Sequence, residues 1–350
     1  MAPKRGRGAS GGRTRRLRIA ALYVPDTPNT WYRSLVPLRA LERRGHQVLW
    51  PSRGNPLAEL LADPPRCDVF VISHYFDERL LAEVQRLRRQ GVAVVWDKDD
   101  DISASRRGSE IRVRYGGRRG QRRAFACSVE VAAACSLMTT PSAHLAQRYR
   151  DEGVERVEVI ENFLAPEQLA GDRPRHPGVV IGLTAAGEHR HDIRKLSIEK
   201  LLGRLLAAHE GVRVVSIGCP LDLPEGRHVN HRDVPIAQLV AAERTFDVGL
   251  APLVDSPFNR ARSNVKLKEY AAAGATWVAS PVGPYAGMGE QQGGLLVADG
   301  DWYGTLEQLV VDYRRRGELM ERARAWAPTQ SIEHAVDRWE AALADVVARA

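Results

Sequence analysis

Cysteine is scarce in this chain of 350 residues, and its few cysteines are not spaced for a metal site or a disulfide. None belongs to a CxxC or Cys-His pattern, and two of them would lie about two helical turns apart. The four are Cys67, Cys127, Cys135 and Cys219. The sequence therefore indicates neither bound zinc nor a disulfide.

Acidic residues are absent before Asp26, whereas seven basic residues precede it and supply most of the net charge of +8. Residues 1–16 are rich in Arg, Lys, Gly and Ser without an apolar period, which predicts a disordered basic arm. The arm lacks the apolar region of a secretory signal. Because the rest of the chain is nearly neutral, the net charge alone does not indicate a nucleic-acid-binding protein.

A membrane-spanning stretch is missing as well. The uncharged run from Tyr270 to Gly289 is long enough, but three glycines and two prolines between Pro281 and Gly289 would expose backbone to lipid. With 44% hydrophobic and 27% charged residues, the chain is typical of a soluble two-domain enzyme. We expect it in the cytoplasm.

A second basic segment runs from Arg106 to Arg123, with eight arginines against Glu110 alone. Its four glycines favour a mobile loop. Together with the basic arm, it has the charge to contact anionic lipid, nucleic acid or an acidic acceptor, so a peripheral position at the inner membrane face stays open. A solvated surface insertion explains the segment equally well.

Short β-rich segments alternate with amphipathic ones along the whole chain, which predicts parallel sheets covered by helices, an α/β fold. The expected strands are 17–24, 47–50, 68–72, 92–96, 137–140, 157–160, 179–183, 212–217, the neighbourhood of Val229, 248–251, 276–279 and 295–297. The expected helices are 31–44, 78–89, 123–135, 143–150, 194–208, 235–244, 260–273, 302–315 and 332–348.

The segment APEQLAGDRPRHP, residues 165–177, has three prolines and no period, so it is predicted to be a linker between two domains. The strand-helix alternation restarts after it. We therefore expect a doubly wound domain at 17–168, a second one at 178–328 and a final helix within 329–350.

The stretch FNRARSNVKLKEYAAAGATWVASPVGPY, residues 258–285, has the features of a nucleotide-diphosphate pocket. Polar and basic residues crowd the start of a predicted helix, where the helix dipole favours an anion. They are Asn259, Arg260, Arg262, Ser263 and Lys266. Glu269, one turn beyond Lys266, has the chemistry to accept ribose hydroxyls, although a solvated ion pair explains these two residues alone. Small residues and Gly283 let backbone approach a ligand.

NVKLKEYAAAGATWVASPVGPY resembles the donor-site segment of family 4 of the retaining nucleotide-sugar glycosyltransferases. The resemblance extends through FDVGLAPLVDSPFNRARS and GGLLVADGDWYGTLEQLVVD and spans nearly all of residues 178–325. It implies the GT-B fold, with two Rossmann-like domains across a cleft and a last helix that crosses back onto the first. It also implies a nucleotide-diphosphate sugar as co-substrate, no other cofactor, no metal, and retention of configuration.

The segment GLTAAGEHRHDIRK follows the first strand of the second domain and supplies further candidates. Its His189 and Asp192 resemble a His and an Asp of related transferases, and Gly187 lets backbone approach a pyrophosphate. We expect Arg194, Lys266 and His189 to be catalytic, with Arg262 assisting at the diphosphate. Gly218 matches the place where relatives seat the base. Ala261 departs from the common family pattern, which has a further Glu at that position.

The acceptor-side candidates lie at strand ends of the first domain, where ligands bind in doubly wound sheets. They are Asn29, Arg33, His74, Asp97 and Asp99. The acidic run at 97–101 resembles a metal-binding motif, but we expect no metal there. Helix caps, packing and salt bridges explain several of these residues without a ligand.

Two other functions stay open at this stage. A non-catalytic scaffold with the same fold would bind partners through the basic arm and segment. Glycosyl transfer onto nucleic acid predicts duplex binding that weakens steeply with salt.

Overall fold

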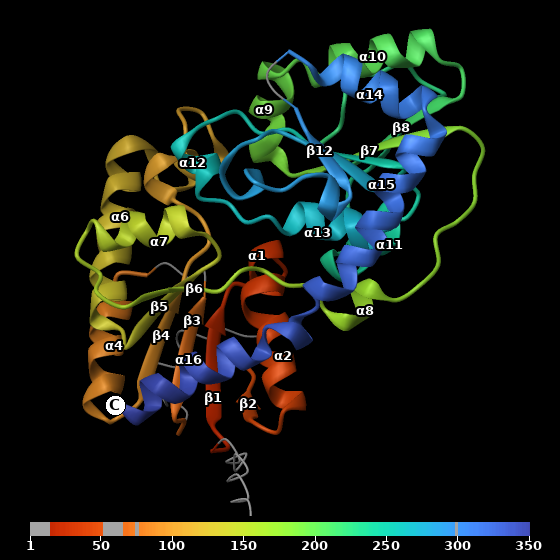
Figure 1. The fold of residues 1–350 in the computed structure, drawn as a ribbon. Coiled ribbons are helices and arrows are strands. Elements are labelled where there is room, and N and C mark those ends of the chain that lie inside the picture. The colour runs from red at the N-terminus through yellow and green to blue at the C-terminus, as the bar shows by residue number, and fades with distance from the viewer. Residues whose placement is uncertain (1–14, 52–65, 74–76, 298–299) are drawn as a thin grey trace, which may run out of the picture.

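The structure is a computed structural model that describes residues 15–51, 66–73, 77–297 and 300–350. These residues form two six-stranded parallel sheets that lie in separate halves of the molecule (Figure 1). The strand order is β2-β1-β3-β4-β5-β6 in the N-terminal domain and β12-β11-β10-β7-β8-β9 in the C-terminal domain. Both orders reverse beside the first strand of their sheet, which creates a crevice at the carboxyl ends of the strands.

The N-terminal sheet is buried on both faces because alternate residues of each strand point to opposite sides. Ile19 and Ala21 pack with α2 and α16, while Ala20 and Leu22 pack with α4, α6 and α7. The strands are β1 (Arg18–Tyr23), β2 (Gln47–Leu49), β3 (Val69–Ser73), β4 (Ala93–Asp97), β5 (Leu137–Thr140) and β6 (Val157–Val159). The helices are α1 (Pro28–Thr30), the π-helical η1 (Trp31–Leu35), α2 (Val36–Arg43), α4 (Leu80–Arg89), η2 (Ile102–Ala104), α5 (Glu110–Arg114), α6 (Gly117–Ala134), α7 (Ala143–Arg150) and α8 (Pro166–Leu169).

The C-terminal sheet is built in the same way. Ile181 and Leu183 pack with α10 and α14, and Val180 on the other face packs with α11 and α13. The strands are β7 (Val179–Ala185), β8 (Val212–Gly218), β9 (His228–His231), β10 (Val248–Ala251), β11 (Thr276–Ala279) and β12 (Gly294–Leu296). The helices are η3 (Gly187–His189), α9 (Arg190–Lys195), α10 (Ile198–Ala208), η4 (Ile236–Gln238), α11 (Leu239–Glu243), α12 (Pro257–Arg260), α13 (Val265–Ala272), η5 (Gly283–Tyr285), η6 (Glu290–Gln292), α14 (Trp302–Val311), α15 (Tyr313–Trp326), η7 (Ala327–Gln330), η8 (Ile332–His334) and α16 (Val336–Ala348).

The last helix crosses back to the first domain, as the resemblance implied. The blue α16 in Figure 1 leaves the C-terminal domain and lies against the N-terminal one. Val336, Trp339 and Leu343 are buried in the same apolar cluster as β1 and α2. This stripe at helical spacing closes one face of the first sheet, so the chain's last segment is part of the first domain's core.

All the predicted strands are confirmed, whereas several predicted helices are divided or shifted. The helix expected at 194–208 is two helices, because Ser197 adopts a left-handed backbone with φ 54° between α9 and α10. The basic segment 106–123 is not a mobile loop as expected, since it contains α5 and the start of α6. Local glycines favoured a loop, but packing of α6 against α4 decides the structure. Residues 1–14 of the predicted basic arm lie outside the described residues.

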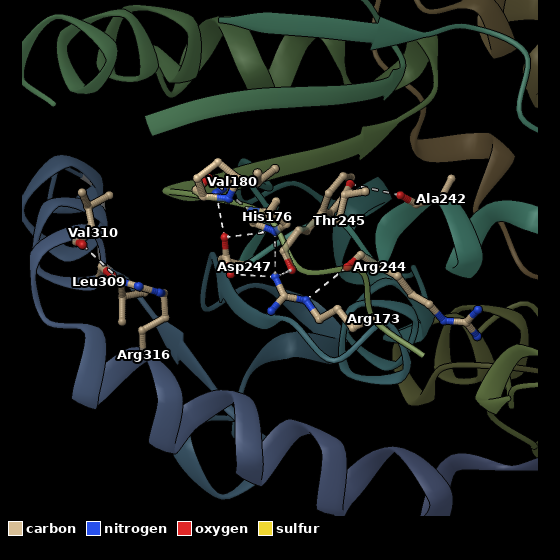
Figure 2. A network of polar contacts seen from close by, with 12 residues as sticks. Arg173, His176, Val180, Ala242, Arg244, Thr245, Asp247, Leu309, Val310 and Arg316 are labelled. Carbon is tan, nitrogen blue, oxygen red and sulfur yellow. Dashed lines mark hydrogen bonds and ion pairs between the residues drawn. The ribbon is translucent and has the colours of Figure 1, made fainter. Parts of the chain in front are cut away.

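The segment predicted as a linker contains α8, and its second part is tied to the C-terminal domain (Figure 2). Arg173 donates to the carboxylate of Asp247 over 2.6 Å and to the carbonyl of Phe246 over 2.8 Å. Asp247 in turn accepts the backbone N–H of Val180 over 2.7 Å. The chain therefore enters β7 along a fixed path, and the domain limits 17–168, 178–328 and 329–350 stay a prediction. Among the helices of the described ranges, none is long and apolar enough to cross a membrane.

Candidate functional site

A cavity of about 910 Å³ lies between the two domains, at the carboxyl ends of both sheets. From the C-terminal domain it is lined by the ends of β7, β8 and β10, which flank the point where the strand order reverses. From the N-terminal domain it is lined by residues 26–32 and by Asp99, Asp100 and Asn162. Its volume lies within the range of pockets that enclose small-molecule ligands.

One wall of the cavity carries a lysine between two carboxylates. Lys266 on α13 lies 2.7 Å from Oε2 of Glu269 and 4.0 Å from Oε1 of Glu243. Burial by itself would lower the pKa of Lys266, but the two carboxylates outweigh it and raise that pKa. Lys266 is therefore a fixed cation at the cavity wall.

Glu243 is fully buried behind this lysine. Its Oε1 accepts the hydroxyl of Thr184 over 2.6 Å, and its Oε2 has no hydrogen-bond partner among the described residues. Burial, reinforced by the charge of Glu269, raises the pKa of Glu243 to about 8. The cluster thus holds the cation of Lys266 and, at Glu243, a carboxyl group that keeps its proton at neutral pH.

Glu269 is also the point where the two domains meet. Tyr32, on η1 of the N-terminal domain, donates its hydroxyl to Oε1 of Glu269 over 2.5 Å. Gln168 of α8 donates to the same hydroxyl over 2.9 Å. Burial and the charge of Glu269 raise the pKa of Tyr32 well above its usual value, so the phenol remains a donor. A ligand that binds Glu269 would compete with Tyr32.

Arg262 provides a second cation at the cavity and is held by two partners. Its Nη1 donates to Nε2 of His189 over 2.7 Å, and its Nη2 donates to Glu188 over 3.0 Å. Burial and the neighbouring guanidinium lower the pKa of His189. Burial would raise the pKa of Glu188, but the charge of Arg262 outweighs it and lowers that pKa to about 2. His189 is therefore neutral, and its Nε2 accepts a hydrogen bond that orients the guanidinium of Arg262.

The helix start predicted at these cations is interrupted. α12 ends at Arg260 and α13 begins at Val265, so Arg262 and Ser263 lie in the connection rather than in the first turn of one helix. Arg260 pairs with the exposed Asp255 over 2.6 Å and does not line the cavity. Ser263 lines it and accepts from Asn162 of the other domain over 3.0 Å.

Asn259 and Asp192 hold this connection in shape rather than face the cavity. The amide of Asn259 donates to Asp192 over 3.1 Å and to the carbonyl of Val254 over 2.8 Å, and both residues are buried. Neither lines the cavity. Ala261, where relatives carry the further Glu, is fully buried against the N-terminal domain, and its carbonyl accepts from Ser142 over 2.6 Å. Ala261 itself is not part of the cavity lining.

The three predicted glycines have different surroundings. Gly218 lines the cavity with φ +85°, and a Cβ there would come within 2.5 Å of the carbonyl oxygen of Ala185. Gly283 has φ +55°, and its Cβ would meet the backbone of Arg260 at 2.7 Å. Gly218 therefore lets backbone face a ligand, whereas Gly283 packs its loop onto α12. Gly187 begins η3 and is not part of the cavity lining.

Arg194 does not reach the cavity. It is an exposed residue in the last turn of α9 and is absent from the lining. The sequence interpretation assumed one long helix starting near this residue, but α9 ends at Lys195, and the cavity lies at the strand end before it. The cations that line this wall are Lys266, Arg262 and the exposed Arg232, and the first two lie beside Glu269 and His189.

On the acceptor side, Asn29 and Asp99 line the cavity, while Arg33 and Asp97 do not. The amide of Asn29 donates to Asp99 over 2.9 Å. Arg33 and Asp97 are fully buried and form an ion pair with a 2.6 Å contact. Arg33 also donates to Asn162 over 3.0 Å. We expected Arg33 and Asp97 to contact the acceptor, but this geometry corrects that expectation. The two side chains are buried, pair with each other in the N-terminal domain and do not line the cavity.

His74 lies outside the described residues. The acidic run is divided by the end of β4: Asp97 points into the core, Asp101 accepts the backbone N–H of Ser103 over 2.9 Å, and Asp99 and Asp100 line the cavity. Within the described ranges, no three His, Cys, Asp or Glu side chains are placed to hold a metal ion together.

Sequence reasoning missed several residues of the site, among them Tyr32, Glu243 and Arg114. Glu243 lies three and four positions after the buried Val240 and Leu239. This helical spacing is a signal that could have predicted a buried carboxylate. Tyr32 lies next to the candidates Asn29 and Arg33 in the sequence, but nothing in the local pattern indicated its contact with Glu269. Arg114 lines the cavity because the segment expected to be a loop is a helix.

No family model matches this chain, and no curated protein matches it. Solved structures do match its fold. HepE of Anabaena, in complex with UDP-glucose, is 14% identical with a TM-score of 0.62, over 93% of this chain and 98% of HepE. A UDP-forming α,α-trehalose-phosphate synthase from Burkholderia xenovorans is 17% identical with a TM-score of 0.58, over 83% of this chain and 77% of the synthase. A candidate UDP-N-acetylglucosamine 2-epimerase from Listeria monocytogenes is 11% identical with a TM-score of 0.57, over 94% and 96% of the two chains.

These similarities show the fold. The chain has the GT-B architecture of two Rossmann-like domains that face each other, as the resemblance implied. Because this fold is shared by proteins named for different reactions, the function has to be argued from the cavity itself.

Proposed function

We propose that this protein is a glycosyltransferase that takes a sugar from a nucleotide-diphosphate sugar, with the donor in the C-terminal domain and the acceptor in the N-terminal one. The observation that carries the proposal is the interdomain cavity whose C-terminal wall presents Lys266 and Arg262 above Glu269. The fold neighbours support it, because HepE was crystallised with UDP-glucose and the Burkholderia protein is a UDP-forming synthase.

The proposed chemistry follows from the charges that develop in the reaction. Cleavage of the donor's glycosidic bond leaves positive charge on the sugar and negative charge on the diphosphate. Lys266 and Arg262 would stabilise the departing diphosphate, and His189 would keep Arg262 oriented toward it. Glu269 would accept the ribose hydroxyls in place of Tyr32. We include retention of configuration and independence of a metal ion in the proposal, as the resemblance implies.

The test combines donor binding with turnover. Uridine- and guanosine-diphosphate sugars are screened by thermal shift, because a ligand at a hundred times its Kd stabilises a protein by about 2.7 kcal/mol. Release of nucleoside diphosphate is then measured for the donor that binds. Lys266→Ala should lower turnover by about a hundredfold or more. Arg260→Gln, an exposed arginine six residues away, should change it less than about twofold.

Two outcomes would contradict the proposal. Equal turnover by Lys266→Ala and the wild type would show that the reaction does not take place at this cavity wall. Donor binding without turnover, across all donors and acceptors tried, would favour a scaffold of the same fold. Transfer onto nucleic acid instead predicts duplex binding that falls steeply with salt and is lost when residues 1–16 are deleted.

A further inference from the structure

Six of the eight arginines of the segment 106–123 lie on α5 and the start of α6, and these six are here called the arginine face. Arg114, Arg118, Arg119 and Arg122 are exposed and make no ion pair with a described residue. Arg123, by contrast, forms an ion pair with Glu78 over 2.7 Å. The face therefore keeps most of its positive charge uncompensated.

Several arginines elsewhere on the same domain's surface have ion-pair partners. Arg148 pairs with Glu152, and Arg156 pairs with Asp345 over 2.6 Å. Arg43 pairs with Glu333 over 2.6 Å. Because the chain outside residues 1–18 and 106–123 carries more acidic than basic residues, the arginine face is a local source of positive potential rather than part of a basic protein.

The face is continuous with the acceptor side of the cavity. Ile111 and Arg114 of α5 line the cavity together with Asn29, Asp99 and Asp100. The carboxylates and the amide suit sugar hydroxyls, and the guanidinium of Arg114 begins the positive surface that α6 continues. A molecule with a hydroxyl group in the cavity would thus meet Arg114 of α5, and α6 with its arginines packs against α5.

The dimensions and composition of the face favour one class of molecule. From Arg118 to Arg123 the helix rises by about 7.5 Å, and Arg114 lies on a separate helix, so the face has room for more than one anionic group. Binding to single-stranded nucleic acid relies on exposed aromatic rings, and the aromatic residue of this segment, Tyr115, is half-buried. Insertion into a membrane needs an apolar face, whereas Val113 is the exposed large hydrophobic residue here, at 71%.

We propose that the acceptor is an extended soluble molecule with several anionic groups, held by the arginine face while its reactive hydroxyl lies beside Asp99 and Asp100. The inference rests on the proposed function, because it takes the N-terminal side of the cavity as the acceptor site. It adds the chemical class of the acceptor and the surface that selects it.

The test measures the binding of matched chains to the full-length protein, with and without saturating uridine diphosphate. The probes are maltohexaose, which is neutral, hexagalacturonate, which carries carboxylates, and linear inorganic hexaphosphate. At least one anionic chain should bind at least tenfold more tightly than maltohexaose, and raising salt should weaken it. Whether carboxylates or phosphates bind better tells which anionic group the acceptor carries.

A matched pair of triple variants separates the arginine face from general charge. Arg118→Gln, Arg119→Gln and Arg122→Gln together should weaken the anionic chain about tenfold, because each exposed contact contributes a modest and similar share. The control replaces Arg89, Arg213 and Arg314, which are also exposed and lack an ion pair with a described residue, and should change binding less than twofold. Thermal unfolding checks that both variants fold, and Arg114→Gln should weaken the chain as well.

Several results would overturn the proposal. Equal affinity for the neutral and anionic chains would do so, as would equal losses in the two triple variants. Binding to phosphatidylglycerol vesicles or to single-stranded DNA, without binding of the soluble chains, would assign the face to a membrane or to nucleic acid. Failure of the proposed function is seen separately, as absent donor binding and turnover, because the chain titration requires neither.

Discussion

The two walls of the cavity differ in how their charges are held. On the C-terminal wall Lys266 is held by Glu269 and Arg262 by Glu188, while Arg232 is exposed at the same wall. On the N-terminal side Arg33 is buried away from the cavity, in the Arg33–Asp97 pair, whereas the exposed Arg114 lines the cavity and makes no ion pair with a described residue. A pre-organised wall suits a constant ligand such as a nucleoside diphosphate, whereas open charges suit a longer and more variable one.

The largest effect is expected for the N-terminal wall, and it is an effect on stability. Arg33→Met leaves Asp97 as a buried, unpaired carboxylate, which should lower the free energy of unfolding by about 3–5 kcal/mol. Arg39→Met, the same change on an exposed residue of α2, should cost less than about 1 kcal/mol. Urea unfolding measures both. If Arg33→Met unfolds like the wild type and instead raises the KM of an acceptor, Arg33 belongs to the binding surface after all.

Gly218→Ala tests whether the C-terminal wall needs bare backbone. The left-handed backbone alone costs a side chain about 1–2 kcal/mol, and the contact with the carbonyl of Ala185 adds to it. Gly91→Ala is the matched control, because Gly91 has φ +78° and nothing within 4 Å of the added Cβ. Gly218→Ala should lose more stability than Gly91→Ala. Calorimetry should show weaker donor binding for Gly218→Ala and unchanged binding for Gly91→Ala. Equal effects of the two changes would reduce Gly218 to a turn glycine.

A pH series sharpens the comparison at Glu243. Its pKa is raised from 4.5 to about 8 in the folded protein, so the folded chain keeps a proton that the unfolded chain releases. The contribution of this group to stability is therefore complete below pH 4.5 and is lost as the pH rises toward 8. Glu243→Gln should remove that loss. The unfolding free energy of the variant minus that of the wild type should therefore increase as the pH rises from 5 to 8. A constant difference over this range would mean that Glu243 is ionised throughout.

The smallest effect is expected for the contact that joins the walls. Tyr32→Phe removes the hydroxyl that occupies Glu269, so donor affinity should rise by about threefold. Tyr149→Phe deletes an equally buried phenol, bonded to Ser128 over 2.7 Å in the N-terminal core, and should leave donor affinity unchanged. Isothermal titration measures both variants. Weaker donor binding by Tyr32→Phe would show that the tyrosine supports the site rather than competes for it.

Strand positions were predictable because apolar β-branched runs bounded by turn residues depend on local sequence. The interruption between α12 and α13 was not, since it depends on Ala261 docking against the other domain. Lys266 and Glu269 were found from their spacing on one helix. Arg194 was misplaced because the break at Ser197 gave no signal, and Arg33 was misread because its partner Asp97 lies 64 residues away in sequence.

The central claim is that Lys266 and Arg262 hold the diphosphate of a donor at the C-terminal wall. A crystal structure with uridine or guanosine diphosphate tests it most directly. The account predicts the base near Gly218, the ribose on Glu269 and the phosphates within hydrogen-bonding distance of Lys266 and Arg262. A nucleotide bound anywhere else, with Lys266 still paired to Glu269 and Tyr32 in place, would contradict it.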